Sequence, residues 1–252
     1  MKNKILVFVL IIFCCKSNAQ IINSNPTLKD IYTKKIGNLR FSTSTLSFGK
    51  VFNNQIKQDT IHIMNSGSSE LTLLVNSKTD YLNLVLSSGK IGPGQEGWIA
   101  VSYDVSKKKD YGFVLDRIAL NTNDKDQPIK NINITATIEE YFAQSDSLSP
   151  KAVLNQLNFD YGEIFQGEKV SHDFLITNVG VNPLVIHKVK SSCGCIKTSI
   201  TKTEIAKGES AIIHVDFDSF GKEGKDNRTI IVYLNDPEKS VLNLDLNGSV
   251  KK

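Results

Sequence analysis

Gly97-Trp98-Ile99-Ala100-Val101-Ser102-Tyr103 is the stretch that decides the fold, because apolar core residues occupy every second position. Successive side chains of a β-strand point to opposite faces, so Ile99, Val101 and Tyr103 are expected in a core. The same pattern returns in Ser210-Ala211-Ile212-Ile213-His214-Val215-Asp216-Phe217. From residue 44 onward, short alternating strands are separated by turn residues, and the chain is predicted to be all-β.

The two halves of the chain repeat each other in order. Ile63-Met64-Asn65-Ser66-Gly67 recurs as Ile176-Thr177-Asn178-Val179-Gly180, and Asn123-Asp124 recurs about 112 positions later as Asn235-Asp236. An ordered self-match of this kind indicates a duplication. Each unit of about 95 residues suits an immunoglobulin-like, seven-strand β-sandwich. The glycine that ends each motif fits a turn position that requires a positive φ.

The repeat match sets the expected domain boundaries. We expect a signal peptide at 1–19, an N-terminal tether or edge segment at 20–43, a first repeat at 44–138, a linker at 139–152 and a second repeat at 153–252. The linker is short and polar, so some freedom between the two repeats is expected.

The first residues have the pattern of an export signal. Lys2 and Lys4 precede the apolar run 5–13, which is too short to span a bilayer. Small residues then stand at the positions that a signal peptidase requires for a cut between Ala19 and Gln20. We therefore expect an exported protein, located in the periplasm, at the cell surface or in the medium.

A lipoprotein signal is the alternative for this N-terminus. It requires a small residue directly before the lipidated cysteine, whereas Phe13 and Cys14 precede Cys14 and Cys15. In either case the protein folds where disulfides can persist. No later apolar run approaches membrane length, so we expect no transmembrane segment in the mature chain.

The charge of the chain argues against a nucleic-acid partner. The full sequence carries 30 basic and 26 acidic residues, for a net charge of +4. Removal of the signal takes away Lys2, Lys4 and Lys16, which leaves 27 basic and 26 acidic residues. A net charge near +1 provides no electrostatic footprint for nucleic acid or a membrane surface.

The loop Ser191-Ser192-Cys193-Gly194-Cys195-Ile196 holds the two cysteines of the expected mature chain. Four states are open: an intramolecular disulfide, two reduced thiols packed as small hydrophobes, an intermolecular disulfide, and a site for a soft metal such as Cu(I). Gly194 is expected to supply the backbone conformation that so tight a ring needs. A three-residue disulfide loop contributes only about 1.6 kcal/mol through loop entropy.

Support for the metal alternative is thin. His187 lies upstream of Cys193, but His62 and His214 alternate with core residues and are expected to face outward, and Met64 lies in the other repeat. A structural zinc site normally has four ligands. That many are not visible, so no cofactor or metal is expected.

The second repeat resembles domain of unknown function 1573, a family common in exported proteins of Bacteroidetes-type bacteria. The resemblance rests on a set of spaced residues around the cysteines: Phe159, Gly162, Phe174-Leu175-Ile176-Thr177-Asn178, Gly180, Pro183-Leu184, Ile186, Val189, Ser192-Cys193-Gly194-Cys195, Gly208-Glu209 and Phe217. It implies a hydin-like, immunoglobulin-type sandwich, related more distantly to major sperm protein and pilus chaperones, and no established activity. Thr79-Asp80-Tyr81 stands where the cysteine loop would be, so the first repeat resembles a degenerate copy.

Catalytic motifs are not supported. Ser47-Phe48-Gly49-Lys50 and Ser219-Phe220-Gly221-Lys222 read S-x-x-K, but that chemistry needs a helical turn and further partner motifs. The stretch Asn121–Asp126 suggests a calcium loop but lacks the glycine and the glutamate that an EF-hand requires. We therefore expect no enzyme activity.

The sequence favours a non-enzymatic binding or scaffolding protein that uses the loop from Ser191 to Ile196. Its partner is expected to be a protein or another component of the cell envelope. The alternatives are a redox-active or copper-handling protein that uses Cys193 and Cys195, and a periplasmic protein that acts like a pilus chaperone. The sequence leaves the oligomeric state open.

Overall fold

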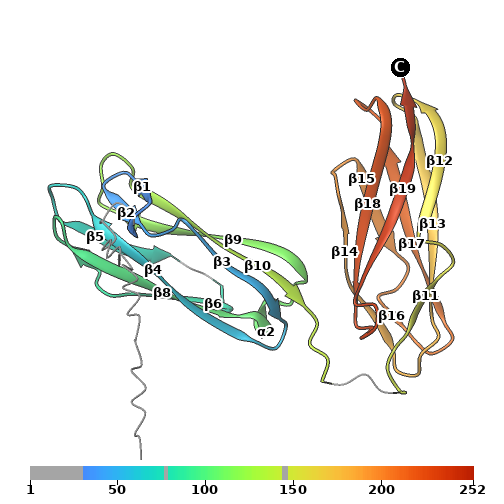
Figure 1. The fold of residues 1–252 in the computed structure, drawn as a ribbon, viewed down its shortest axis with the longest axis horizontal. Coiled ribbons are helices and arrows are strands. Elements are labelled where there is room, and N and C mark those ends of the chain that lie inside the picture. The colour runs from blue at the N-terminus through green and yellow to red at the C-terminus, as the bar shows by residue number, and fades with distance from the viewer. Residues whose placement is uncertain (1–30, 77–78, 144–146) are drawn as a thin grey trace, which may run out of the picture.

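The structure is a computed structural model that describes residues 31–76, 79–143 and 147–252. The chain forms two all-β sandwiches in series (Figure 1). The predicted signal peptide and its cleavage point between Ala19 and Gln20 lie outside the described residues. Among the helices within the described ranges, none combines the length and apolarity needed to cross a membrane.

The first repeat packs two five-stranded sheets against each other, with the strand orders β1-β2-β4-β8-β6 and β3-β10-β9-β5-β7. A single helical turn, α2 (Val105–Lys108), directly follows strand β8. The strands are β1 (Lys34–Ile36), β2 (Leu39–Phe41), β3 (Thr45–Phe52), β4 (Ile56–Asn65), β5 (Leu71–Asn76), β6 (Leu82–Leu86), β7 (Lys90–Ile91), β8 (Glu96–Asp104), β9 (Gly112–Thr122) and β10 (Ile129–Glu139).

The second repeat has one four-stranded sheet, β11-β13-β17-β15, and one five-stranded sheet, β12-β19-β18-β14-β16. Its strands are β11 (Ala152–Leu154), β12 (Asn158–Phe165), β13 (Lys169–Asn178), β14 (Leu184–Ser191), β15 (Ile196–Ile200), β16 (Glu204–Ile205), β17 (Ser210–Asp218), β18 (Gly224–Leu234) and β19 (Val241–Lys251). Ala152, which we had placed in the linker, is the first residue of β11.

Seven longer strands in each repeat correspond one to one. β3 and β12 have 8 residues, β4 and β13 have 10, and β8 and β17 have 9. The last two strands of each repeat have 11 residues. In both repeats the first long strand pairs in parallel with the last one, with a register shift at the same place in the ladder. The tandem seven-strand frame predicted from the sequence is confirmed, with additional short strands.

Alternation along each strand builds the two cores. Ile99, Val101 and Tyr103 are buried, and the equivalent Ile213, Val215 and Phe217 are fully buried. His62, between Ile61 and Ile63, and His214, between Ile213 and Val215, face outward, as the alternation predicted. Burial of a large apolar side chain contributes about 1.5–3 kcal/mol. The inward residues of the paired sheets therefore account for most of what holds each sandwich together.

A buried asparagine organises one end of each sandwich. The Asn65 side chain donates to the carbonyls of Ser69 (2.8 Å) and Ile91 (2.9 Å) and accepts from the Gly67 amide (2.9 Å). Asn178 makes the equivalent bonds to Asn182, Ile205 and Gly180 at 2.9, 3.0 and 2.9 Å.

The expectation of a positive φ at Gly67 and Gly180 is wrong. Gly180 is needed for space instead, because a Cβ there would lie 2.5 Å from the Lys151 amide nitrogen. At Gly67 a Cβ would lie 3.0 Å from the Cβ of Asn38. These glycines let another stretch of backbone or a side chain approach closely.

The first repeat begins earlier than the boundary at residue 44. Leu39 and Phe41 of β2 are fully buried in its core, and β2 pairs with β4. Asn38 also donates its backbone amide and its side-chain amide to Asp124, at 2.7 and 2.9 Å. Of the segment 20–43, expected as a tether or edge, the part from Lys34 to Phe41 is therefore an edge of the sandwich.

The two repeats contact each other directly, which reduces the freedom expected from the linker. The rings of Tyr111 and His187 stack with centroids 4.2 Å apart, and Lys188 donates to Asp110 at 2.6 Å. Nε2 of His187 lies 2.5 Å from Oε2 of Glu140, although the two atoms are not aligned as a hydrogen bond. His187 thus belongs to this joint and not to a metal site with the cysteines.

Candidate binding site at the disulfide loop

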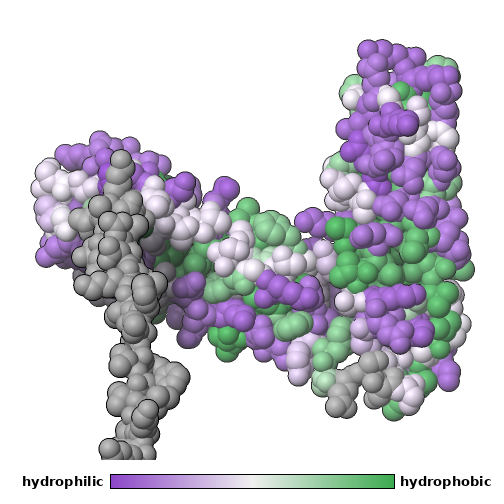
Figure 2. Space-filling view, viewed as in Figure 1, coloured by the Kyte–Doolittle hydropathy of each residue, from purple (hydrophilic) through white to green (hydrophobic). Residues whose placement is uncertain are grey.

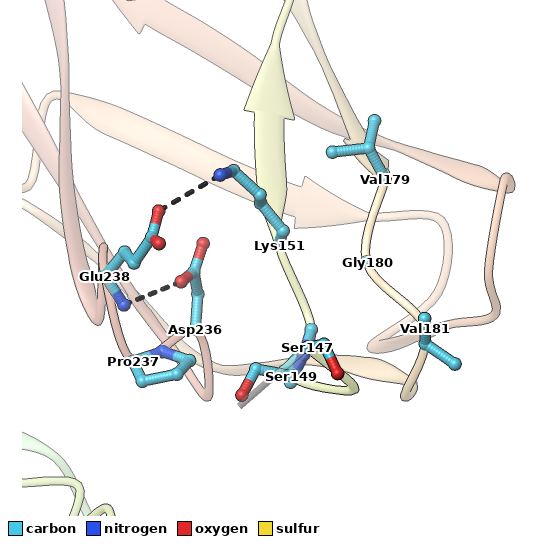
Figure 3. A pocket seen from close by; sticks show the side chains of 10 residues that line it. Ser147, Ser149, Lys151, Val179, Gly180, Val181, Asp236, Pro237 and Glu238 are labelled. Atoms are coloured by element: carbon cyan, nitrogen blue, oxygen red, sulfur yellow. Dashed lines mark hydrogen bonds and ion pairs between the residues drawn. The ribbon is translucent and has the colours of Figure 1, made fainter. Parts of the chain in front are cut away.

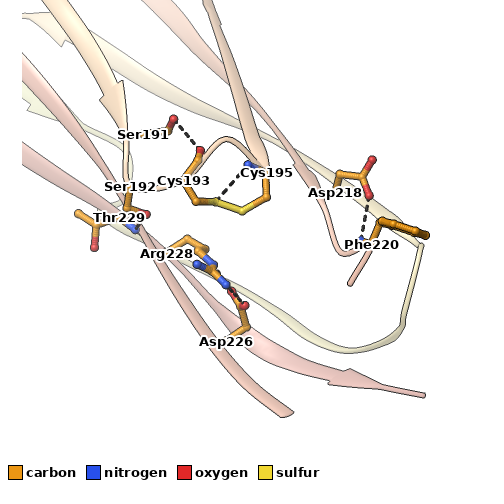
Figure 4. Close-up of a disulfide and its surroundings, with 9 residues drawn as sticks. All are labelled: Ser191, Ser192, Cys193, Cys195, Asp218, Phe220, Asp226, Arg228 and Thr229. Atoms are coloured by element: carbon orange, nitrogen blue, oxygen red, sulfur yellow. Dashed lines mark hydrogen bonds and ion pairs between the residues drawn. A yellow bond between two sulfur atoms is a disulfide. The ribbon is translucent and has the colours of Figure 1, made fainter. Parts of the chain in front are cut away.

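The cysteine loop connects β14 to β15, and its two cysteines are joined by a disulfide across Gly194 (Figure 4). Their Cα atoms are 5.2 Å apart, within the range that a disulfide allows. Of the four states left open by the sequence, the structure contains the intramolecular disulfide. Both cysteines are half-buried and pack against the core of the second repeat.

Hydrogen bonds hold the loop to its neighbours. Ser191 Oγ donates to the Cys193 carbonyl at 3.0 Å, and the amide of Ser192 donates to the Thr229 carbonyl at 2.9 Å. The Cys195 amide approaches Sγ of Cys193 at 3.3 Å, and the Ile196 amide donates to the Cys193 carbonyl at 3.3 Å. The loop is therefore fixed on β18 and on the start of β15.

Gly194 does not have the role that the sequence suggested. Its φ is not positive, and a Cβ at this position would meet nothing within 4 Å. The ring closes without a positive φ at Gly194, so glycine is not required there for the disulfide.

A shallow cavity of about 320 Å³ lies beside the disulfide, on the sheet that contains β15. Its lining combines both charge signs with Cys195 and the edge of the core: Lys169, Ser171, Gly194, Cys195, Lys197, Asp216, Phe217 and Asp218. In the space-filling view, the end of this repeat that carries the C-terminus is predominantly hydrophilic (Figure 2). The cavity is thus suited to polar and charged groups.

The acidic residues of this cavity are held in their charged form. The hydrogen bond from Ser171 lowers the pKa of Asp216, and His214 adds to the effect. The hydrogen bond from the Phe220 amide lowers the pKa of Asp218, and Lys169 adds to the effect. At neutral pH the cavity therefore presents two carboxylates between two lysines.

The described residues contain no group of three or more histidine, cysteine, aspartate or glutamate side chains arranged to hold a metal ion. His214 lies on the outer face of β17, 2.5 Å from Asp173 and 3.2 Å from Asp216. The bond to Asp173 raises the pKa of His214. The side chains of His187 and His214 are thus engaged away from the disulfide.

One feature near the loop was not predicted from the sequence. Arg228 of β18 donates its Nε to Asp226 at 2.6 Å, and the pair lies beside the disulfide (Figure 4). Asp226 is nearly buried. Two opposite charges at positions i and i+2 on one face of a strand could have indicated an ion pair. Their place beside the loop follows only from the register between β14 and β18.

A second cavity, of about 280 Å³, lies at the opposite end of the repeat, by the buried Asp236 (Figure 3). The Asp236 carboxylate accepts from the backbone amides of Ala152 (2.8 Å) and Glu238 (2.9 Å). Lys151 and Glu238 form an ion pair at 3.2 Å across its mouth. Because Asp236 bonds to backbone, it ties β11 to the β18–β19 turn and serves the fold.

The fold and the loop define a class: a tandem immunoglobulin-like protein in which only the second repeat carries the disulfide loop. Residues 153–250 match the family described as protein of unknown function DUF1573, and residues 37–137 match the HYDIN/CFA65/VesB-like, Ig-like domain. The second repeat is therefore a DUF1573 domain, as its motif predicted, and the first is a hydin-like Ig domain. The comparison with curated proteins gives no match.

One solved structure supports the fold. A protein of unknown function from Porphyromonas gingivalis W83 is 18% identical, with a TM-score of 0.58, over 84% of this chain and all of that chain. The YadV chaperone is 10% identical, with a TM-score of 0.32, over 83% of this chain and 99% of its own. The likeness to the first structure shows the sandwich fold alone, and the score of the second supports no argument.

Proposed function

We propose that this protein is an exported, non-enzymatic binding or scaffolding protein that recognises its partner with the disulfide loop of the second repeat. The observation that carries the proposal is the loop's position: a disulfide fixes it beside a charged cavity, on a frame that the first repeat builds without cysteines. Because the first repeat has this frame without cysteines, we expect the fold not to need the disulfide, which leaves the loop available for recognition. Rigid loops on a sandwich scaffold are common sites of binding.

The chemistry of the cavity indicates the kind of partner. Lys169 and Lys197 face Asp216 and Asp218, so a partner segment with both charge signs would find complementary groups. A protein or another charged component of the cell envelope fits this surface. Exposed ion pairs contribute little affinity each, so the half-buried disulfide would supply the apolar part of the contact.

Site-specific photo-crosslinking in the native host tests this proposal. A photoreactive residue in place of Lys197 is expected to yield a discrete covalent adduct with an envelope component. The same residue in place of Asn131, exposed on the outer face of β10 in the first repeat, is the matched control and should yield none. Unlabelled wild-type protein should compete for the adduct, and a Lys169→Glu/Lys197→Glu variant should not. Absence of an adduct at position 197 would contradict the proposal.

A redox role is the second candidate, because Cys195 lines the cavity and can be approached there. In such a role a thiolate of the partner attacks one sulfur, forms a mixed disulfide and releases the other cysteine as a thiolate. Titration against glutathione, followed by free-thiol counting with and without Cu(I), separates the two functions. A disulfide that stays oxidised and binds no copper would exclude the redox and copper alternatives and leave the binding role.

A further inference from the structure

The turns after β3 and β12 build the same end of their two repeats. The Asn53 amide donates to the Glu139 carbonyl at 2.9 Å, and the Gln166 amide donates to the Lys251 carbonyl at 2.7 Å. In the first repeat this end forms the joint with the second repeat. The same end of the second repeat carries the C-terminus and points away from the first repeat (Figure 1). One copy of a shared surface is thus engaged within the chain, and the other faces outward.

The outward-facing end exposes two phenylalanines. Phe165 is 60% exposed, and Phe220, two residues beyond β17, is 80% exposed. Ser219 Oγ donates to the Phe165 carbonyl at 3.1 Å, so the two loops that carry these rings are joined. The first repeat has the half-buried Phe52 and Ser106 at these two places. Because aromatic side chains are enriched in the cores of protein contacts, this end of the second repeat has the chemistry of an interface.

The surface that receives the end of the first repeat lies on β14 and β18. The Asp110 carboxylate pairs with Lys188 at 2.6 Å. A Cβ at Gly112 would clash with the hydroxyl of Tyr233, the ladder partner of Lys188. The joint is therefore a close contact between the end of one repeat and one row of side chains on the next.

The first repeat has the same row of positions, with apolar residues in it. The ladder places Leu74, Asn121 and Ile129 in one row across β5, β9 and β10. The equivalent row of the second repeat, across β14, β18 and β19, holds Lys188 and Tyr233. Leu74 is 65% exposed and Ile129 is 50% exposed. This row thus offers apolar side chains where the second repeat has a lysine that pairs with the first.

We propose that the Phe165/Phe220 end of one molecule docks on the Leu74/Ile129 row of a second copy, head to tail. The contact repeats, between chains, the joint that connects the two repeats within a chain. Both of its surfaces change in the same sense: an acidic end meets a lysine within the chain, and two phenylalanines meet a leucine and an isoleucine between chains. Because the two surfaces differ, the contact is heterologous and can continue from copy to copy.

The association goes beyond the binding role of the disulfide loop and does not depend on it. It would place several loops along one assembly, and linked sites bind a surface with repeated partners more tightly than one site does. Two aromatic side chains bury only about 150–250 Å² each, so the association is expected to be reversible and dependent on concentration. Adducts between copies, including any at Asn131 beside this row, have a multiple of the chain's mass, which separates them from an adduct with an envelope component.

Sedimentation velocity of the mature chain over a wide range of concentrations tests the proposal. The wild type is expected to form dimers and larger species reversibly. Phe220→Ser and Leu74→Ser are each expected to raise the dissociation constant by about tenfold or more, because a large apolar side chain is lost from the contact. Leu175→Ser, at a 40% exposed position on the outer face of β13, is the matched control and should leave the association unchanged. A monomeric wild type, or a control that weakens the association as much, overturns the proposal.

A mixture of the two variants tests the direction of the contact. Phe220→Ser retains the Leu74 row and Leu74→Ser retains the phenylalanine end, so an equimolar mixture contains the two halves of one intact contact. At concentrations where neither variant associates alone, the mixture is expected to form heterodimers and nothing larger. A two-fold contact between like surfaces would give no such recovery. A mixture that stays monomeric while the wild type associates overturns the head-to-tail pairing.

Discussion

Tyr81 and Cys195 hold the same place in two copies of one frame. The Tyr81 carbonyl accepts from the Asp104 amide at 2.8 Å, and the Cys195 carbonyl accepts from the Asp218 amide at 2.9 Å. In the first repeat the side chain then enters a polar cluster, where Tyr81 donates to Asp116 at 2.9 Å. In the second repeat the side chain closes a disulfide instead.

The polar cluster of the first repeat is completed by two more groups. Asp116 accepts from Lys108 at 2.5 Å and from Tyr103 at 3.1 Å. Burial and the charge of Asp116 raise the pKa of Tyr103 well above its usual range, so its hydroxyl stays protonated. This difference between the two repeats shows that the strands and their buried turn residues determine the shared fold. The corner between β14 and β15, or β5 and β6, can be closed by either chemistry.

The largest effect is expected at a buried ion pair that the second repeat lacks. Asp124 and Lys130 are fully buried and 2.5 Å apart, whereas Leu242 stands at the position of Lys130 in the second repeat. Asp124→Asn leaves the Lys130 ammonium buried without a countercharge and is expected to cost about 3–5 kcal/mol of unfolding free energy. Urea unfolding measures the loss, and hydrogen exchange should place it in the first repeat. Asp236→Asn, which removes bonds to backbone only, should cost about 1–3 kcal/mol.

The same pair predicts a dependence on pH. Burial alone would raise the pKa of Asp124, but the Asn38 amide and Lys130 lower it to about 2. The pKa of an unfolded aspartate is about 3.9, so this stabilisation is complete above about pH 4 and is lost as the pH falls towards 2. Asp124→Asn should abolish this part of the acid sensitivity of the first repeat. An unchanged acid profile would show that the carboxylate is not stabilised in this way.

A smaller effect is expected in the polar cluster. Asp116→Asn removes the charge that neutralises Lys108, which is only 12% exposed. Loss of a hydrogen-bonded partner at such a site costs about 1–3 kcal/mol. Hydrogen exchange should increase around β6, β8 and β9 and stay unchanged in the second repeat. Equal destabilisation of both repeats would mean that the cluster affects stability through the contact between the repeats and not only within the first repeat.

The disulfide should matter less than the ion pair. Cys193→Ser with Cys195→Ser is expected to cost no more than about 1.6 kcal/mol, because the closed loop has only three residues. The second repeat should stay folded, as the first does without cysteines. Circular dichroism and thermal unfolding check this. Loss of the fold of the second repeat would show that the disulfide is part of its frame.

The smallest effect is expected at Gly194. Because a Cβ there would meet nothing within 4 Å and φ is not positive, Gly194→Ala should change stability by less than about 0.5 kcal/mol. Its disulfide should form as in the wild type, measured by free-thiol counting. A reduced or unstable Gly194→Ala variant would indicate a backbone requirement that the structure does not contain.

The frame could be predicted from the sequence because it depends on local alternation. Ile99 and Val101 face the core for the same reason that Ile213 and Val215 do, and a self-match fixes the correspondence. What escaped prediction depends on contacts between distant residues. Gly180 is required by the approach of Lys151, which the local turn pattern does not reveal.

The candidate site was predictable only in part. The cysteine motif located the loop, but four states of Cys193 and Cys195 remained open until the structure joined them in a disulfide. The cluster of Tyr81, Asp116 and Lys108 joins three separate elements, and no local pattern connects them. The contact of His187 with Tyr111 likewise joins the two repeats across the linker.

The parallel pairing of the first and last long strands has a mechanical consequence. In the second repeat, β12 and β19 run side by side in the same direction over seven residue pairs. If tension is applied along the chain, these strands are pulled in opposite directions along their length, so their hydrogen bonds are loaded together in shear. They cannot open one at a time like a zipper. The second repeat should therefore unfold at high force in single-molecule stretching, and a low, stepwise unfolding force would contradict this.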